Sequence, residues 1–239
     1  LFKFKKNIIV INNKPNGKNI NLKCGSLHPE KLQKKLIKKR YDFGLALDGD
    51  SDRCVLISRK YGLIQSEKTI FIFLEMLDID TLNKLVCTSE IVNKALESNL
   101  SINKYILYQT KVGDRNVINI SKKKKAKIGF EPSGHFYFPK LNNSMDGNLS
   151  IILILNYFMQ KSNNFKNINE LDHYNRIVEN IPKSSVDISL KTIKKRILKL
   201  KTTKNEKLII RQSIWDPIYR LYYDYKKKNR FEKIRKVVI

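Results

Sequence analysis

The chain has 239 residues, of which 41% are hydrophobic and 10% aromatic, and its formal net charge is +26. This length and apolar content exclude a disordered protein and allow one large core or two to three small ones. The charge invites a nucleic-acid interpretation. We discount it because lysine is abundant throughout the chain and no basic stripe is interleaved with stacking aromatics. The same basic field would attract small anions.

The cysteines Cys24, Cys54 and Cys87 are scattered without Cys-x-x-Cys spacing, which predicts neither a disulfide framework nor a zinc site. The longest apolar stretch, from Leu149 to Met159, is interrupted by polar residues and is too short to span a bilayer. With no signal-like N-terminus, the sequence indicates a cytoplasmic location. Because the first residue is Leu1 and not methionine, we expect the sequence to begin partway through a longer protein.

The first part of the chain predicts a helix packed beside a pair of strands. Leu32 and Leu36 lie four residues apart, after a proline and before a basic turn, which is typical of an amphipathic helix. Apolar, β-branched runs on either side predict strands. The expected elements are a strand over 7–11, a turn-rich loop over 12–17, the helix over 29–40, a strand over 43–47 and a hairpin over 54–58 and 63–65.

The middle of the chain alternates between strand and helix patterns, which predicts an α/β fold with a mainly parallel, doubly wound sheet. The expected elements are helices over 70–76 and 90–97, strands over 84–88 and 105–110, a helix after Asp114, and a helix to about Gln160 that Asp146 caps. Ligands bind such sheets at the carboxyl ends of the strands. Two polar loops, over 111–115 and 131–135, fall there and should face one crevice.

The last part of the chain predicts a small α+β domain. Residues 161–169 are polar and rich in asparagine, which favours a linker. Beyond them, the pattern predicts strands over 186–189, 207–211 and 220–224, with a basic helix between the first two.

Three carboxylates, Asp48, Asp50 and Asp52, occupy alternate positions directly after an apolar run. Like charges this close repel one another by about 1 kcal/mol or more per pair, so the arrangement indicates a divalent cation that neutralises them. Because all the donors are hard oxygens, Mg²⁺ or Ca²⁺ is favoured over zinc.

The spacing of this acidic cluster disfavours two other kinds of acidic loop. An EF-hand loop that starts at Asp48 requires glycine at its sixth position and glutamate at its twelfth, where this chain has Arg53 and Arg59. A haloacid-dehalogenase-type phosphatase also begins with a strand and Asp-x-Asp, but a third aspartate followed at once by arginine is not its pattern. A plain acidic turn without an ion stays open on the local pattern alone.

Four motifs in order resemble the α-D-phosphohexomutase family. The metal loop of that family reads Asp-Gly-Asp-x-Asp-Arg, as residues 48–53 do, and its sugar loop reads Glu-x-Ser-Gly-His, as residues 131–135 do. The glucosamine branch of the family has a Pro-(Asn/Asp)-Gly-x-Asn-Ile-Asn stretch before Cys-Gly-Ser, similar to residues 15–21 and 24–26. It also has a Val-Gly-Asp-Arg loop, similar to residues 112–115.

The resemblance implies four domains around a cleft, of which this chain would hold the later ones. Residues 1–67 would be the end of the second domain, residues 68–160 the third, residues 161–178 a linker and residues 179–239 the fourth. The Ser-His-Asn-Pro type of phosphoserine loop, which belongs to the first domain, does not occur in this sequence. By itself, the chain is therefore not expected to catalyse the reaction of the family.

The implied reaction transfers a phosphoryl group from phosphoserine to glucosamine 6-phosphate and, through a bisphosphate, leaves glucosamine 1-phosphate. Such transfer depends on positioning and charge neutralisation. The implied partner is a sugar phosphate, with no nucleic acid or membrane, in a monomer or homodimer. The resemblance assigns Mg²⁺ ligation to Asp48, Asp50 and Asp52, catalysis to Arg53, Lys111 and His135, and sugar binding to Glu131, Ser133 and His135.

The phosphate loop of the fourth domain departs from the family pattern. Arg211, Ser213 and Arg220 keep its polar ends and are the expected phosphate ligands, but Ile214 and Trp215 replace small residues whose N–H groups would cradle the anion. In addition, Met145 stands where the family has a glycine before the capping aspartate. Two alternatives therefore stay open: a mutase for another hexose phosphate, and a degenerate paralogue that only binds ligand.

Overall fold

The computed structural model describes residues 8–77, 84–161, 168, 170–171, 173–186, 188–200, 202–213, 216–227 and 229–238. Its order is α1 (Glu30–Lys39), β1 (Phe43–Leu47), β2 (Cys54–Ser58), β3 (Gly62–Ile64), α2 (Ser66–Met76), β4 (Leu85–Ser89), α3 (Lys94–Ile102), β5 (Ile106–Thr110), α4 (Asp114–Lys124), β6 (Ile128–Phe130), β7 (Phe136–Tyr137), α5 (Gly147–Gln160), β8 (Asn175–Pro182), a 3₁₀ turn (Lys183–Ser185), α7 (Leu190–Lys199), β9 (Glu206–Gln212), β10 (Ile218–Tyr225) and α8 (Phe231–Val238).

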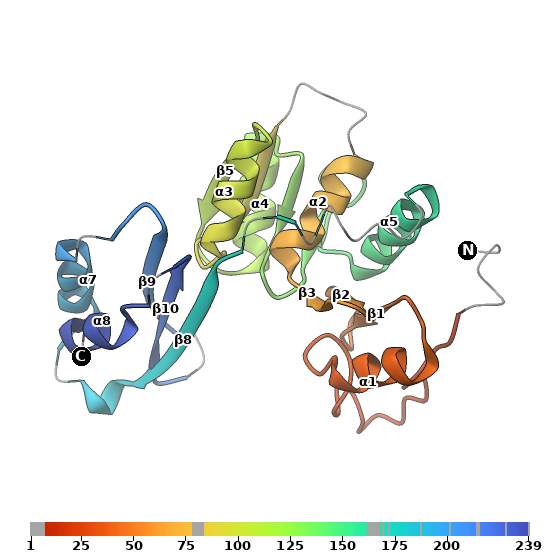
Figure 1. Cartoon of the computed structure of the whole chain (residues 1–239), viewed down its shortest axis with the longest axis horizontal. Coiled ribbons are helices and arrows are strands. Elements are labelled where there is room, and N and C mark those ends of the chain that lie inside the picture. The colour runs from red at the N-terminus through yellow and green to blue at the C-terminus, as the bar shows by residue number, and fades with distance from the viewer. Residues whose placement is uncertain are drawn as a thin grey trace.

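The first sheet is antiparallel, in the order β1-β2-β3, and helices cover both of its faces. Alternation along β1 explains this arrangement: Gly44 and Ala46 lie toward α1, whereas Phe43 and Leu47 pack into the large core that includes α5. The Phe43 ring lies 4.7 Å from that of Phe158 on α5. The carboxyl end of β1, where the acidic cluster begins, is thereby held between two helices (Figure 1).

The second sheet has the order β5-β4-β6-β7, with β5, β4 and β6 parallel and β7 antiparallel to β6. The α/β fold with mixed and parallel sheets is therefore confirmed. One continuous apolar core joins this sheet, α2, α5 and the first sheet, with the ring of Phe73 4.8 Å from that of Phe136. The parallel strands end at the edge that carries the loops 111–115 and 131–135, as expected.

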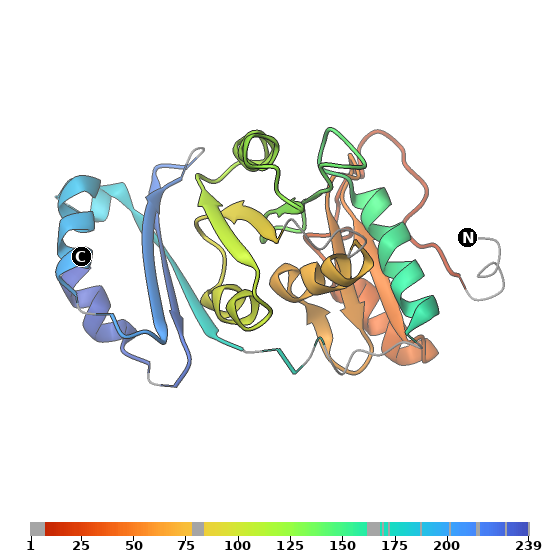
Figure 2. The same ribbon diagram turned by 90° about the horizontal axis from the view of Figure 1, so that it is seen from above.

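The third sheet, β8-β10-β9, is antiparallel and has its own core. Helices α7 and α8 cover its outer face, and its other face lies toward the second sheet (Figure 2). The apolar core of this unit is separate from the large core. Hydrogen bonds and ion pairs connect the third sheet to the second-sheet unit.

Three details of the sequence prediction are wrong. Residues 8–11 form no strand, because a β-branched run needs a partner strand and none of the described strands pairs with it; residue 7 lies outside the described residues. Of the strand expected at 186–189, the described residues 186, 188 and 189 lie in no strand, and residue 187 is outside the described residues. Ser189 instead caps α7 by accepting a hydrogen bond from the Thr192 N–H. The helix expected at residue 90 begins at Lys94, because residues 90–91 form a turn. Side chains from the third sheet bind the carbonyls of Ile91 and Val92 in this segment.

The described helices include none with the length and apolar composition needed to cross a membrane. The three cysteines form no disulfide; Cys54 and Cys87 are buried and Cys24 is partly exposed.

A buried carboxylate in the third sheet predicts how this unit responds to acid. Burial alone would raise the pKa of Glu206, but hydrogen bonds from Arg230, Tyr223 and Thr203 lower it to about 2, against an ordinary value of 4.5. A lowered pKa stabilises the fold above the ordinary value, and this stability is lost as pH falls from 4.5 toward 2.

Replacing Glu206 with glutamine is therefore expected to destabilise the third-sheet unit by about 1–2 kcal/mol at pH 7, a discounted value because the partly exposed Arg230 is screened by solvent. Thermal unfolding followed between pH 7 and pH 2 measures the effect, which should shrink at acid pH. Glu232→Gln, at an exposed position of α8, is the matched control. Equal losses in both variants would contradict the assignment.

Candidate active site

The acidic loop between β1 and β2 is a tight turn that gathers its three carboxylates. Asp48 accepts a hydrogen bond from the Arg53 N–H at 3.1 Å, and the Ser51 N–H donates to the Asp48 carbonyl at 3.3 Å. Ser51 adopts the left-handed conformation, with φ of 61°. One oxygen from each of Asp48, Asp50 and Asp52 lies within 4.8 Å of the others. The sequence prediction that these three side chains converge is consistent with this geometry.

The electrostatics of this loop fit a divalent cation. Burial is the largest cause that raises the pKa of Asp52 to about 6, followed by the interactions with Asp48 and Asp50, while Arg53 lowers it. The Oδ1 atom of Asp52 is buried and has no hydrogen-bond partner among the described residues, with the Arg53 Nε 3.9 Å away. A buried acceptor without a donor, beside two further carboxylates, is the environment that a hard cation satisfies. These three side chains can therefore hold Mg²⁺ or a similar ion.

The loop after β6 places its polar side chains against the acidic loop. The Oγ of Ser133 and the Nδ1 of His135 are 2.8 Å apart, and Oε1 of Glu131 accepts a hydrogen bond from the Gly113 N–H at 3.0 Å. That second contact connects this loop with the loop after β5. The two loops expected to face one crevice are thus joined.

Arg53 and His135 connect the acidic loop with the loop after β6. Their backbones form an isolated antiparallel bridge, and the Arg53 Nε–H donates to His135 Nε2 at 3.1 Å. Because Nε2 accepts this bond, the imidazole proton lies on Nδ1 and points at Ser133 Oγ. Burial and, next, the charge of Arg53 lower the pKa of His135, which favours this neutral form.

A second contact at this junction brings two acceptor atoms together. Oδ2 of Asp52 lies 3.2 Å from His135 Nε2. Both atoms are acceptors when the histidine is neutral and the aspartate is ionised, so positive charge or a proton close by makes their approach favourable. The Arg53 Nε, at 3.1 Å from His135 Nε2, provides such charge, and a cation held by Asp52 would add to it.

Two glycines outside the acidic loop allow other segments to reach it. A Cβ at Gly147, the first residue of α5, would lie 2.6 Å from the Arg53 carbonyl oxygen and 2.8 Å from that of Ser51. The Gly147 N–H donates to the Ser51 carbonyl at 3.0 Å. Gly134, at φ of 98°, accepts from the Cys54 N–H at 2.9 Å. Gly134 belongs to the motif expected at residues 131–135, whereas no expected role fell on Gly147.

Comparison with known proteins places this geometry in a family. Residues 65–174 match the family described as phosphoglucomutase/phosphomannomutase, alpha/beta/alpha domain III. The phosphoglucosamine mutase of Aliarcobacter butzleri is 34% identical over 237 residues, which cover 97% of this chain and 53% of that protein. This chain belongs to the phosphohexomutase family.

Further relatives agree with the assignment. The phosphoglucosamine mutase of Clostridium tetani is 40% identical over 166 residues, 69% of this chain and 36% of that protein. Among solved structures, a phosphoglucomutase/phosphomannomutase family protein of Burkholderia thailandensis has a TM-score of 0.74 at 18% identity, covering 89% of this chain and 49% of that one. The chain spans about half the length of the curated relatives that it matches over most of its residues.

Another solved structure with a similar fold was determined as a ligand complex. The N-acetylphosphoglucosamine mutase of Aspergillus fumigatus, in complex with GlcNAc-6P and magnesium, has a TM-score of 0.67 at 12% identity and covers 93% of this chain and 53% of that one. At this identity, the likeness establishes the phosphohexomutase fold alone.

Lys111, a predicted catalytic residue of this phosphohexomutase chain, lies near the joined loops without reaching them. It follows β5 and is exposed, and among the described residues it has no hydrogen-bond or ion-pair partner. Gly113, two residues later, donates to Glu131. The backbone thus brings the Lys111 loop to the site, while its amine stays in solvent.

The predicted phosphate ligands lie apart from the acidic loop, on the hairpin of β9 and β10. Arg211 pairs across the strands with Arg220, whose guanidinium contacts Asp216 at 3.0 Å. Ser213 Oγ donates to the same carboxylate at 3.0 Å. Ile214 and Trp215, which depart from the family pattern, lie outside the described residues. Asp216 therefore occupies polar groups that an anion would need.

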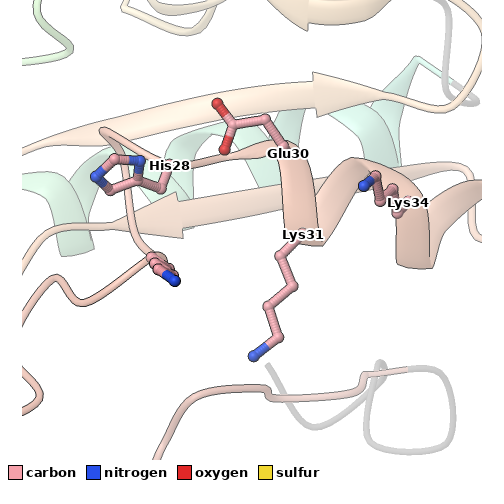
Figure 3. Close-up of a pocket in the computed structure, with 5 residues that line it drawn as sticks. His28, Glu30, Lys31 and Lys34 are labelled. Atoms are coloured by element: carbon pink, nitrogen blue, oxygen red, sulfur yellow. The ribbon is translucent and has the colours of Figure 1, made fainter.

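A hollow of the surface lies beside α1. It has a volume of about 390 Å³ and is lined by Lys23, His28, Glu30, Lys31 and Lys34. The labelled side chains diverge and share no common point (Figure 3), and Lys31 instead donates to Asn12 at 2.9 Å. An anion would find no converging donors there, so this hollow is not a functional candidate.

Proposed function

We propose that this chain forms the metal-binding and sugar-binding part of a phosphoglucosamine mutase, which interconverts glucosamine 6-phosphate and glucosamine 1-phosphate. The observation that carries the proposal is the junction of Arg53 and His135, because it joins a cation-binding loop to a loop whose polar groups suit sugar hydroxyls. The names of the relatives at 30% to 40% identity support the amino sugar.

Mg²⁺ is the proposed ion, held by Asp48, Asp50 and Asp52. When bound there, it would neutralise charge on the phosphoryl oxygens during transfer. The guanidinium of Arg53, fixed by Asp48 at 3.2 Å and by His135, would present positive charge to the same group. We propose Lys111 as a mobile second charge, since its loop reaches the site through Gly113.

The sugar is proposed to bind at Glu131, Ser133 and His135. Neutral His135 would take the proton of the reacting hydroxyl at Nε2 once the Arg53 Nε–H leaves this atom, because Nδ1 already carries its proton toward Ser133. Glu131 would accept from a second hydroxyl with Oε2, since Oε1 is bonded to Gly113. On the separate hairpin, Arg211 would meet the far phosphate together with Ser213 and Arg220, once Asp216 releases the latter two.

Calorimetry on this chain tests the metal assignment. We expect weak Mg²⁺ binding that Asp50→Asn reduces at least tenfold, because Asp50 is an exposed ligand whose replacement leaves the packing intact. Asp42→Asn, which removes an exposed carboxylate that pairs with Arg59, is the matched control and should bind as wild type does. Equal Mg²⁺ affinity in the Asp50→Asn variant and wild type would contradict the assignment.

Competition binding in the presence of Mg²⁺ tests the sugar. Glucosamine 6-phosphate should bind more tightly than glucose 6-phosphate or mannose 6-phosphate, and Ser133→Ala should weaken it about fivefold or more, because the proposed hydrogen bond from Ser133 to the sugar is lost. Ser101→Ala, at an exposed position, is the control. Preference for another hexose phosphate would indicate a different mutase, and binding of none would indicate a degenerate paralogue.

The activity is tested in a chimera, since the relatives are about twice as long as this chain. Fusing the unmatched part of the Aliarcobacter butzleri relative ahead of Leu1 should produce interconversion of the two glucosamine phosphates. The same chimera with Asp50→Asn should be inactive. A folded chimera that binds glucosamine 6-phosphate but does not interconvert the two phosphates would contradict the catalytic proposal.

A further inference from the structure

The polar contacts between the second and third sheets concentrate on one short segment, residues 91–94, at the carboxyl end of β4. Every residue of this segment has a backbone polar group bonded to a charged side chain. The Ile91 carbonyl accepts from Arg176 at 2.7 Å, and the Val92 carbonyl accepts from Lys207 at 2.9 Å. The Asn93 N–H donates to Glu67 at 3.1 Å, and the Lys94 N–H donates to Asp224 at 2.8 Å.

Three of these charged side chains come from the third sheet and are bonded to more than the segment. Arg176 of β8 binds Asp224 of β10 through two nitrogens, at 2.6 Å and 2.8 Å. The Asp224 side chain is only 1% exposed. Lys207 of β9 also contacts Glu97 of α3 at 3.0 Å. All three strands of the third sheet therefore contribute a charge to this contact.

Apolar packing does not replace these bonds, because the core of the third-sheet unit is separate from the large core within the described residues. Buried, bidentate ion pairs have strict geometry, so they specify one arrangement more strongly than apolar contact does. The segment also begins at the same sheet edge as the loops after β5 and β6. The contact is thus placed where it can set the distance between the hairpin of β9 and β10 and the sugar loop.

We propose that Arg176, Asp224 and Lys207 form a latch that fixes the third-sheet unit at the ligand-binding edge of the second sheet. This proposal rests on the proposed function only for its purpose, which is to hold Arg211 and Arg220 at one distance from the sugar loop. Whether the latch exists depends only on the position of the third-sheet unit and not on the reaction. Asp224 and Arg176 are accordingly positioning residues and not catalytic ones.

Two spin labels measure the latch directly. Exposed sites are available at Ile102, the end of α3, and at Leu198 on α7, which are 70% and 83% exposed. Ile102→Cys and Leu198→Cys are introduced with Cys24→Ser, since Cys24 is the partly exposed native thiol. Pulsed electron paramagnetic resonance should give a narrow distribution of the distance between the two labels in the protein that carries only these three substitutions. Asp224→Asn should broaden it at least twofold and speed amide exchange at Asn93 and Lys94 at least tenfold.

Controls separate a latch from a role in folding. Glu179→Gln removes a carboxylate of the same sheet that pairs with the exposed Arg235, and it should leave the distribution narrow. Lys207→Met, which keeps the Arg176 and Asp224 pair, should broaden the distribution while circular dichroism stays unchanged. If Asp224→Asn fails to fold, Lys207→Met decides the result. A narrow distribution in a folded Lys207→Met variant would overturn the latch.

Sugar-phosphate titration keeps this proposal distinct from the proposed function. If wild type binds glucosamine 6-phosphate, the latch variants should lose at least fivefold in affinity. If wild type binds none, the function fails, and the spin-label result still decides the latch.

Discussion

Replacing Gly147 with alanine is expected to destabilise the protein by about 1–3 kcal/mol and to weaken Mg²⁺ binding at least tenfold. Helix propensity alone predicts the opposite sign, since alanine is favoured over glycine in a helix by about 1 kcal/mol. The contact distances decide between the two effects. A Cβ at this position would lie 2.6 Å from the Arg53 carbonyl oxygen, and a backbone atom cannot swing away as a side chain can.

The path from this clash to the metal is short. To relieve it, α5 must retreat from the acidic loop, which breaks the bond from the Gly147 N–H to the Ser51 carbonyl. Ser51 lies between two of the carboxylates in the left-handed conformation, which few residues adopt without external support. The three ligands would then lose their common geometry. Weakened Mg²⁺ binding is therefore expected even in the fraction of molecules that fold.

Calorimetry and thermal unfolding measure the two effects. Gly17→Ala is the control for a glycine without a clash, because nothing lies within 4 Å of a Cβ added at Gly17; unlike Gly147, this glycine has a positive φ, of 78°. That variant should show backbone strain alone and retain full Mg²⁺ affinity. Wild-type affinity in Gly147→Ala would show that the α5 terminus does not position the acidic loop.

The parts of the site that lie within one local motif could be predicted from the sequence. The contacts between distant segments could not, because they depend on long-range packing. The carboxylates of the acidic loop share one turn, so their spacing alone predicts that they converge. In contrast, Arg53 reaches His135 across 82 positions, and only the fold shows that the two loops meet. Gly147 was missed for the same reason, since its constraint comes from backbone atoms of the acidic loop.

The fold was predicted best where apolar periodicity follows burial. Strands β1 and β2 are runs of apolar residues and begin and end as expected. Strand β8 was missed because its pattern is broken by Arg176 and Glu179, which form ion pairs with Asp224 and Arg235. A strand that contains charged residues is easily predicted as a linker when the ion-pair partners of those residues are not known. The start of α3 was misplaced for a related reason, since Arg176 and Lys207 bind the carbonyls of Ile91 and Val92 ahead of the helix.

Replacing Asp52 with asparagine is expected to stabilise the metal-free protein by about 1–2 kcal/mol at pH 7 and to abolish Mg²⁺ binding. The physical reason is that ionised Asp52 is unfavourable in this loop without a bound cation: burial and the carboxylates of Asp48 and Asp50 raise its pKa to about 6. A raised pKa means that stability is complete below the ordinary value of 3.8 and is lost as pH rises through about 6. The full linkage is discounted because Asp52 is about a third exposed.

Mg²⁺ should reverse the order of the two proteins. Bound metal stabilises wild type by about 2.7 kcal/mol at a concentration 100 times its dissociation constant, whereas a variant that does not bind gains nothing. Melting temperatures with and without Mg²⁺, from pH 4 to pH 8, measure both effects. Asp42→Asn, at an exposed carboxylate, should not change the order. If Asp52→Asn is no more stable than wild type in the absence of metal at pH 7, the carboxylates are not held under mutual repulsion. The cation interpretation would then rest on their spacing alone.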